Sequence, residues 1–272
     1  MDAIVTSLHV YPVKACRGLD LVGARLDAAG FEHDRRWLVV TPEGRFVTQR
    51  EAPALARVGT AVADGRLELT FPDGARVPVA PGDAAQRLDV VVWDDRCAGL
   101  DCGDAPAARL GGLLGRPVRL VEFDTRVPRL QRSERVGPLT VPVRYPDAYP
   151  ILLIGEESLE DLNARLPQPL PMDRFRPNVV VRGLGAYGED RVVELRAEGV
   201  RLRPVKACTR CKVTMTDQAT GDVDAAEPLR TLRTYRWDRE LRGVTFGQNV
   251  VIAEGAGATL RVGQRLEVVL RD

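Results

Sequence analysis

The sequence predicts a mainly β fold with some α-helix, arranged as β-barrel architecture. Short segments in which apolar and polar residues alternate recur along the 272 residues, whereas only three segments have helical periodicity. With 44% hydrophobic and 28% charged residues, the chain can bury a sizeable core and cover it. This length corresponds to two small domains or one large domain.

The clearest predicted strand is residues 66–71, where apolar and polar residues alternate between the turn pairs Asp64-Gly65 and Asp73-Gly74. This pattern is typical of a half-buried antiparallel strand between tight turns. We expect further strands at residues 4–11, 37–41, 87–93, 118–123, 179–182, 199–205, 248–254 and 264–270.

Three segments predict helices. Residues 104–115 place apolar side chains on one face, with Asp104 as a possible cap and Gly115 as the stop. Residues 158–166 and 228–235 show the same spacing. Residues 124–146 have no hydrophobic period and contain several prolines and arginines, so we expect a linker or long loop there. The domain boundary is therefore predicted near residue 125.

The charge balance of the chain does not indicate a nucleic acid or an anionic membrane as a partner. The 39 basic and 38 acidic residues leave a net charge of +1, which argues against a nucleic-acid partner and against attraction to an anionic membrane surface. No apolar run approaches the roughly 20 residues needed to span a bilayer. The first residues lack the pattern of a secretory signal, so we expect a cytoplasmic protein without membrane attachment.

Two short segments hold every lysine of the chain and three of its five cysteines. These segments are Tyr11-Pro-Val-Lys-Ala-Cys-Arg-Gly18 and Pro204-Val-Lys-Ala-Cys-Thr-Arg-Cys-Lys212. An odd number of cysteines in a chain without a secretory signal favours reduced thiols over a disulfide framework.

The Cys-x-x-Cys motif formed by Cys208 and Cys211 has several interpretations. A zinc site needs four ligands, and a second suitable pair is missing. A thioredoxin-like redox pair would lie at the start of a helix, whereas residues 212–216 look β-like. A single working thiolate fits better, because the basic residues Lys206, Arg210 and Lys212 favour the charged form. An inert buried cysteine remains an alternative.

Motifs spread over 200 residues resemble a known family. In the second half they are Arg174-Phe-Arg-Pro-Asn178, Lys206-Ala-Cys-Thr-Arg-Cys211, Thr220-Gly221 and Glu227-Pro-Leu229, which resemble the MOSC domain. In the first half, segment 11–18, Asp34-Arg-Arg-Trp37 and Thr48-Gln-Arg50 resemble the β-barrel domain that precedes MOSC in the mitochondrial amidoxime-reducing component and its bacterial relatives. The resemblance implies an N-terminal MOSC-associated β-barrel domain over residues 1–125, followed by a MOSC β-barrel domain over residues 126–272.

The resemblance also implies a molybdenum cofactor (Mo-molybdopterin) in a cleft between the two domains. Cys211 matches the cysteine that ligates the metal and acts in catalysis, whereas Cys208 has no such role in the family. A phosphate-bearing cofactor needs cations, and a soft metal accepts thiolate sulfur. The residues that match cofactor-binding positions are Lys14, Arg35, Arg176, Asn178, Thr209 and Arg210. Ala15 departs from the family, because the reductases often have serine there.

The implied reaction is the two-electron reduction of N-oxygenated compounds such as amidoximes, N-hydroxyguanidines and hydroxylamines. We expect a separate electron-transfer protein as donor, because the five cysteines include no four-cysteine set for an iron–sulfur cluster and the chain ends at Asp272, just after the last expected strand. Asp217 beside Thr220-Gly221 is interpreted as a turn residue rather than a proton relay. The alternative is a cofactor-binding or sulfur-carrier protein without reductase activity, and pyridoxal phosphate binding is a further expectation.

Overall fold

Seven strands close into a barrel in the computed structural model, which describes residues 1–80 and 86–271. Around the barrel, the strands run in the order β14 (Ile151–Gly155), β15 (Val179–Arg182), β1 (Asp2–Val10), β21 (Arg265–Leu270), β16 (Val192–Ala197), β17 (Val200–Thr209) and β19 (Gly243–Glu254). β19 pairs back with β14 and completes the ring. All neighbours are antiparallel except β14 and β15, which run parallel. Two short strands extend this sheet, β2 (Leu19–Leu21) on β1 and β18 (Trp237–Asp238) on β19.

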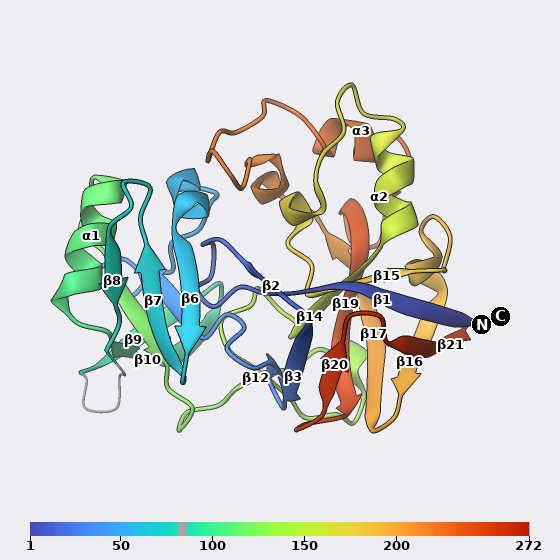
Figure 1. The fold of residues 1–272 in the computed structure, drawn as a ribbon, viewed down its shortest axis with the longest axis horizontal. Helices are drawn as coiled ribbons and strands as arrows, with labels where there is room; N and C mark the ends of the chain where they lie inside the picture. The colour runs from blue at the N-terminus through green and yellow to red at the C-terminus, as the bar shows by residue number, and fades with distance from the viewer. Residues whose placement is uncertain (81–85, 272) are drawn as a thin grey trace.

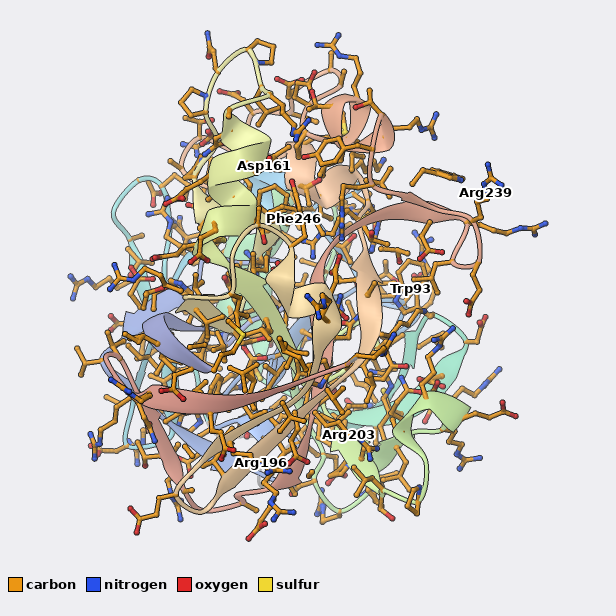
Figure 2. The ribbon with its side chains drawn as sticks, turned by 90° about the vertical axis from the view of Figure 1, so that its right-hand side faces the viewer. Trp93, Asp161, Arg196, Arg203, Arg239 and Phe246 are labelled. Carbon is orange, nitrogen blue, oxygen red and sulfur yellow. The ribbon has the colours of Figure 1, made fainter. Side chains whose placement is uncertain are left out.

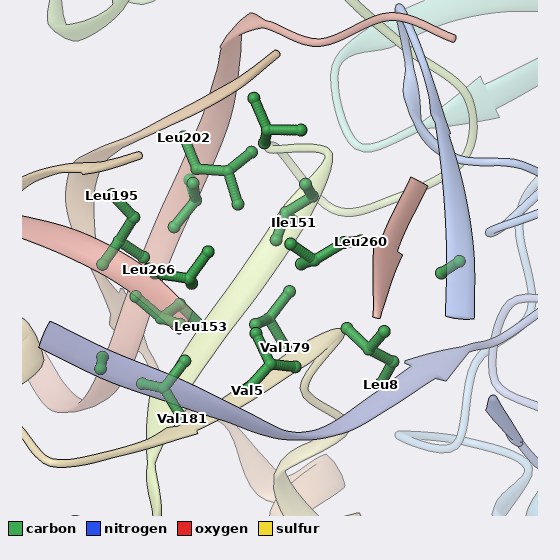
Figure 3. Packing of buried hydrophobic residues seen from close by; sticks show 14 of the residues in the cluster. Val5, Leu8, Ile151, Leu153, Val179, Val181, Leu195, Leu202, Leu260 and Leu266 are labelled. Carbon is green, nitrogen blue, oxygen red and sulfur yellow. The ribbon is translucent and has the colours of Figure 1, made fainter. Parts of the chain in front are cut away.

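Aliphatic side chains from the strands fill the barrel interior (Figure 3). In β1, Ala3 and Val5 point inward, and strict alternation would next bury Ser7. The register of β1 against β15 shifts between Val5 and Ser7, so Leu8 and Val10 are buried instead. This β-bulge keeps a polar residue out of the core at the point where the sequence alternation breaks.

The first residues of the chain lie in the barrel of the second half. β1 sits between β15 and β21, and β3 (Gly23–Asp27) pairs with both β4 (Gly30–Phe31) and β20 (Thr259–Arg261). Figure 1 shows the two ends of the chain side by side at the outer edge of the barrel. The boundary near residue 125 therefore stays a prediction about sequence domains, because in space β1 and β3 pair with strands of the second half.

Two smaller sheets build the rest of the first half. The four-stranded sheet has the order β5 (Trp37–Val40), β11 (Arg119–Phe123), β10 (Asp95–Asp101) and β9 (Arg87–Val92). The three-stranded sheet contains β6 (Gly59–Ala63), β7 (Arg66–Thr70) and β8 (Arg76–Pro78). Apolar residues of both sheets share one core with the helix α1 (Asp104–Leu114) and the 3-10 helix η1 (Pro53–Arg57). Figure 1 shows this part beside the barrel, with α1 on its outer side.

The predicted mainly β fold with barrel architecture is confirmed, with 42% strand and 17% helix. All nine expected strands are present, although β17 continues to Thr209 and β19 begins at Gly243. The three expected helices are α1, α2 (Glu156–Asn163) and α3 (Leu229–Arg233). Within residues 1–80 and 86–271, no helix combines the length and the apolar character that crossing a membrane requires.

The expected cap of α1 is wrong. Gly103 occupies the N-cap position without a side-chain hydrogen bond, and Asp104 is the first helical residue. Instead of capping, the Asp104 carboxylate accepts a hydrogen bond of 2.7 Å from the guanidinium of Arg119. An acidic residue in the first turn still stabilises the positive end of the helix dipole.

The expected linker is also wrong, because residues 124–146 form a hairpin. β12 (Arg129–Gln131) pairs with β13 (Val141–Val143), and the 3-10 helix η3 (Glu134–Val136) lies between them. Arg129 stabilises the hairpin, because its guanidinium donates hydrogen bonds to the carbonyl oxygens of Arg144 at 3.0 Å and Pro146 at 2.9 Å. Strands of three residues are too short to show a period of two in the sequence.

Candidate functional site

A cleft of about 460 Å³ lies where the first half faces the barrel. Its walls include residues 14–15 and 48–50 from the first half, residues 146–149 after the hairpin, and residues 206 and 208–211 at the end of β17 and just beyond it. The structure brings all seven predicted site residues to this cleft: Lys14, Arg35, Arg176, Asn178, Thr209, Arg210 and Cys211. Their roles stay predictions, but their meeting in one cleft makes a shared ligand possible.

The two cysteines of the motif lie at the end of β17 and just beyond it. Cys208 is in the strand, and Cys211 caps the 3-10 helix η6 (Lys212–Met215). The β-like expectation for residues 212–216 was therefore wrong. Both cysteines are free and partly exposed, and the Cys208 sulfur accepts a hydrogen bond of 3.0 Å from Nη1 of Arg210. Thr209 between them is exposed.

The cleft is strongly electropositive. Among the described residues that line it, one carboxylate, that of Asp147, faces six cationic side chains: Lys14, Arg35, Arg50, Arg176, Lys206 and Arg210. Cations that are partly removed from water and lack an equal number of carboxylates create a positive potential, which attracts anionic ligands. The overall charge of +1 conceals this local excess.

Arg176 is a buried cation of this set that has no carboxylate partner among the described residues. Its side chain is only 9% exposed, and the ion pairs of the described residues do not include it. The guanidinium stacks over the ring of Tyr11 at 4.2 Å and donates to Oε1 of Gln218 at 3.0 Å. Burial, with a further contribution from the nearby charge of Arg35, lowers the pKa of Arg176 to about 10. A buried cation without a carboxylate partner is well suited to bind an anion.

Arg35 also contacts the Tyr11 ring, with its guanidinium 4.5 Å from the ring centre. It pairs with Asp34 at 2.6 Å and donates to Oδ1 of Asn178 at 2.9 Å. Asn178 is almost fully buried, and its amide nitrogen donates to Oδ1 of Asp34 at 3.1 Å. These bonds fix the orientation of the Arg35 guanidinium before any ligand binds.

A second cluster joins the first half to the segment after the hairpin. Nζ of Lys14 and Oδ1 of Asp147 are 2.7 Å apart, and Nη2 of Arg50 lies 3.2 Å from Oδ2. Burial lowers the pKa of Lys14 although Asp147 opposes this shift. Burial would raise the pKa of Asp147, but the charges of Lys14 and Arg50 hold it well below its usual range. The carboxylate therefore stays ionised at neutral pH.

Arg50 connects this cluster with Cys211. Burial alone would lower the pKa of Arg50, but the charges of Asp147 and Cys211, together with hydrogen bonds to both, raise it above its usual value. Arg50 and Cys211 thus belong to the same cleft wall.

Backbone strain is concentrated at this cleft. Eight described residues other than glycine have a positive φ, and four of them line the cleft: Ala15 (71°), Arg35 (44°), Trp93 (57°) and Arg176 (54°). Such conformations cost free energy for residues with a Cβ and persist where the surrounding structure enforces them. Their clustering here supports a functional interpretation of the cleft.

The residues present fit a pterin-bound metal better than a metal held by protein alone. The described residues contain no group of three or more His, Cys, Asp or Glu side chains that could hold a metal ion. The cleft instead offers Cys211, surrounded by cations, and the buried Nε of Arg210 has no hydrogen-bond partner within the protein. A cofactor that brings its own sulfur ligands and a phosphate would use both features.

Asp217 is a turn residue, as the sequence analysis predicted. Its Oδ1 accepts hydrogen bonds of 2.9 Å from the backbone nitrogens of Ala219 and Thr220. Its Oδ2 accepts from Arg174 at 3.1 Å. The carboxylate is therefore committed to holding the loop that follows η6.

The residues of the cleft wall that were not predicted as site residues include Gln49, Arg50, Trp93 and Asp147. Gln49 and Arg50 belong to the motif Thr48-Gln-Arg50, which resembles the family, and this motif could have indicated that both residues lie at the site. Trp93 lies in the turn after β9, and Asp147 directly follows the expected linker, so no local pattern marks either one.

Comparisons with known proteins agree with the architecture. Residues 2–117 match the model of the MOSC N-terminal beta barrel domain, and residues 140–267 match that of the MOSC domain. Mitochondrial amidoxime-reducing component 1 of Mus musculus is 37% identical over 274 residues, covering 95% of this chain and 80% of the relative. The Xenopus laevis protein of the same name is 36% identical, covering 98% and 82%, and the Homo sapiens protein is 35% identical, covering 95% and 81%.

These findings give no support to pyridoxal phosphate binding, and relatives named as mitochondrial do not support the expected cytoplasmic location. The two domain matches follow each other in the order that the sequence motifs predicted, and the similarity to the relatives extends over nearly the whole chain. The chain therefore belongs to the MOSC-domain reductase family that includes the mitochondrial amidoxime-reducing components.

Proposed function

We propose that this protein is a molybdenum-cofactor-dependent reductase of N-oxygenated compounds, such as amidoximes, N-hydroxyguanidines and hydroxylamines. The observation that carries the proposal is the meeting of Cys211 and six cationic side chains in one cleft. The names of the relatives, which state amidoxime reduction, support the same reaction class.

The proposal gives each side chain a physical task. Lys14, Arg35, Arg176 and Arg210 bind the phosphate and polar edges of the cofactor through charge-assisted hydrogen bonds. Asn178 fixes the direction of Arg35, and the Thr209 hydroxyl offers a further hydrogen bond. Cys211 supplies the thiolate ligand to molybdenum. The chemistry that the bound cofactor supplies is two-electron removal of oxygen from the substrate nitrogen.

Electrons reach the cleft from a separate electron-transfer protein in this proposal. The three cysteines outside the motif, Cys16, Cys97 and Cys102, are all buried. Burial raises the pKa of Cys16 to about 12 and that of Cys97 to about 11, so these thiols remain protonated at neutral pH. Protonated, buried thiols are poor redox groups and poor metal ligands.

The test compares the two cysteines of the motif in cofactor-loaded protein, with chemically reduced viologen as donor and benzamidoxime as substrate. Native protein should form benzamidine, Cys211→Ser should abolish turnover, and Cys208→Ser should retain much of it. Nicotinamide cofactor alone should support no turnover. An active Cys211→Ser variant together with an inactive Cys208→Ser variant would overturn the assignment.

The sulfur-carrier alternative makes a different prediction in the same experiment. A carrier would reduce neither benzamidoxime nor hydroxylamine under viologen, yet would transfer its cofactor or its sulfur to an apo-enzyme. This result in fully loaded protein would replace the reductase proposal.

A further inference from the structure

Trp93 is the one exposed aromatic residue among the described residues that line the cleft. Its side chain is 48% exposed, and it lies in the turn between β9 and β10. Figure 2 labels Trp93 on the side of the molecule where strands of the first half approach the barrel. A single exposed aromatic residue on a surface needs no explanation by itself, so its setting must carry the argument.

The setting shows that Trp93 is held in place. Its backbone has a φ of 57°, which is a genuine outlier for a bulky residue. Its indole Nε1 donates to Oδ1 of Asp147 at 3.2 Å, and the Phe46 ring meets it edge-on with ring centres 5.1 Å apart. The Arg50 guanidinium lies 4.6 Å from the ring centre. An exposed indole that is fixed by three partners presents a rigid apolar surface at low entropic cost.

The position of this surface relative to Cys211 points to a ligand. Arg50 contacts the Trp93 ring, and both residues line the same cleft as Cys211, the proposed metal ligand. Of the cations proposed to bind the cofactor, Arg35 and Arg176 gather around Tyr11, whereas Lys14 pairs with Asp147, which also accepts the hydrogen bond of the Trp93 indole. Trp93 and Arg50 therefore belong to the part of the wall around Asp147, in the same cleft as Cys211.

We propose that Trp93 is a specificity-determining residue that stacks on the planar aromatic part of an N-oxygenated substrate, while the N-oxygenated group points toward Cys211. This inference rests on the proposed function and narrows its substrate class to flat aryl compounds. Offset stacking on an indole favours planar π systems and gives small aliphatic analogues no comparable contact.

Trp237 provides a matched control. Its side chain is 46% exposed and also lies against an arginine, with Arg233 at 5.2 Å from the ring centre. It lines a different groove, on β18, and does not belong to the cleft that holds Cys211. The third tryptophan, Trp37, is 2% exposed. Variants at positions 93 and 237 thus remove similarly exposed indoles from two different places.

The first experiment measures binding by calorimetry, with benzamidoxime and acetamidoxime as an aryl and an aliphatic probe. Trp93→Ala should weaken benzamidoxime binding about tenfold, or about 1.4 kcal/mol, and leave acetamidoxime unchanged. Trp93→Phe should recover most of the loss, and Trp237→Ala should bind both probes like the native protein. Equal benzamidoxime affinity in native and Trp93→Ala protein, or equal loss of both probes, would overturn the proposal.

The second experiment separates this inference from the proposed function. In cofactor-loaded protein, Trp93→Ala should raise KM for benzamidoxime about tenfold with little change in kcat, and both constants for acetamidoxime should stay near native. The pterin released from Trp93→Ala should equal that from native protein. Reduced pterin content would make Trp93 a cofactor contact and refute the substrate role. Selective aryl binding in a protein that reduces nothing would leave the Trp93 surface intact and refute only the reductase proposal.

Discussion

Replacing Arg176 with methionine should separate cofactor binding from protein stability. Burial lowers the pKa of Arg176 from the ordinary arginine value to about 10, so the folded protein disfavours the charged form by about 3 kcal/mol. Because neutral pH lies below 10, the side chain stays charged and the full cost applies to the cofactor-free protein. An anionic cofactor would offset this cost. Arg176 is therefore expected to lower the stability of the cofactor-free protein and to raise its affinity for the cofactor.

Methionine keeps much of the side-chain volume and removes the charge. It also removes the contact with the Tyr11 ring and the hydrogen bond to Gln218, each of which contributes about 1 kcal/mol. The cofactor-free Arg176→Met protein should therefore be as stable as native protein or more stable by about 1 kcal/mol, which keeps Tm unchanged or raises it by a few degrees. Cofactor occupancy should fall about tenfold or more, because a charge-assisted phosphate contact is lost.

The assay combines thermal unfolding of cofactor-free protein with fluorescence of the pterin released from protein made in a cofactor-producing host. Arg261→Met is the control, because Arg261 is exposed on β20 and lies outside the cleft. This control should change neither Tm nor pterin content. The reasoning fails if Arg176→Met lowers Tm by several degrees while its pterin content stays native, since Arg176 would then be a structural residue.

Two further predictions concern contacts across the cleft. Asp147→Asn should lower the unfolding free energy at neutral pH, because Lys14 is then left buried without its carboxylate. Since the folded pKa of Asp147 is depressed, the Asp147 carboxylate stabilises the folded protein above its ordinary pKa of 3.8, and this stabilisation is lost as the pH falls. In denaturant titrations, the difference in unfolding free energy between native and Asp147→Asn protein should therefore shrink below that pH, and a constant difference would contradict the prediction. Gln49→Leu should lower the free energy of unfolding by about 1 to 3 kcal/mol, because Gln49 and Gln218 exchange two buried hydrogen bonds of 2.9 and 3.0 Å. An unchanged urea midpoint would show that this pair does not help to join the two halves.

The strands could be predicted because their sequences carry the period-two pattern that a half-buried sheet requires. The pattern predicts β7 and β15 to within a residue, but it cannot show the bulge that turns Leu8 inward or the pairing of β1 with β21. These features depend on contacts between residues up to 265 positions apart, such as Asp2 and Glu267. No local pattern encodes the closure of the barrel.

From the sequence, only those residues of the cleft could be predicted that lie in or beside a recognisable motif. The seven predicted residues come together because each lies in or beside a motif of the resemblance. Asp147 and Arg50 are 97 positions apart, and their pairing requires the hairpin that the composition of residues 124–146 concealed. Trp93 has no neighbouring motif, and only its position in the fold places it near Cys211.

X-ray absorption at the molybdenum edge tests the central claim most directly, namely that Cys211 binds a cofactor-borne metal in this cleft. Native protein from a cofactor-producing host should contain up to one molybdenum per chain, with a sulfur shell made of the dithiolene sulfurs and one thiolate. Cys211→Ser should retain pterin through the cations but show one sulfur scatterer fewer, and Cys208→Ser should match the native spectrum. A native sulfur shell in Cys211→Ser, or protein without molybdenum under these conditions, would contradict the account.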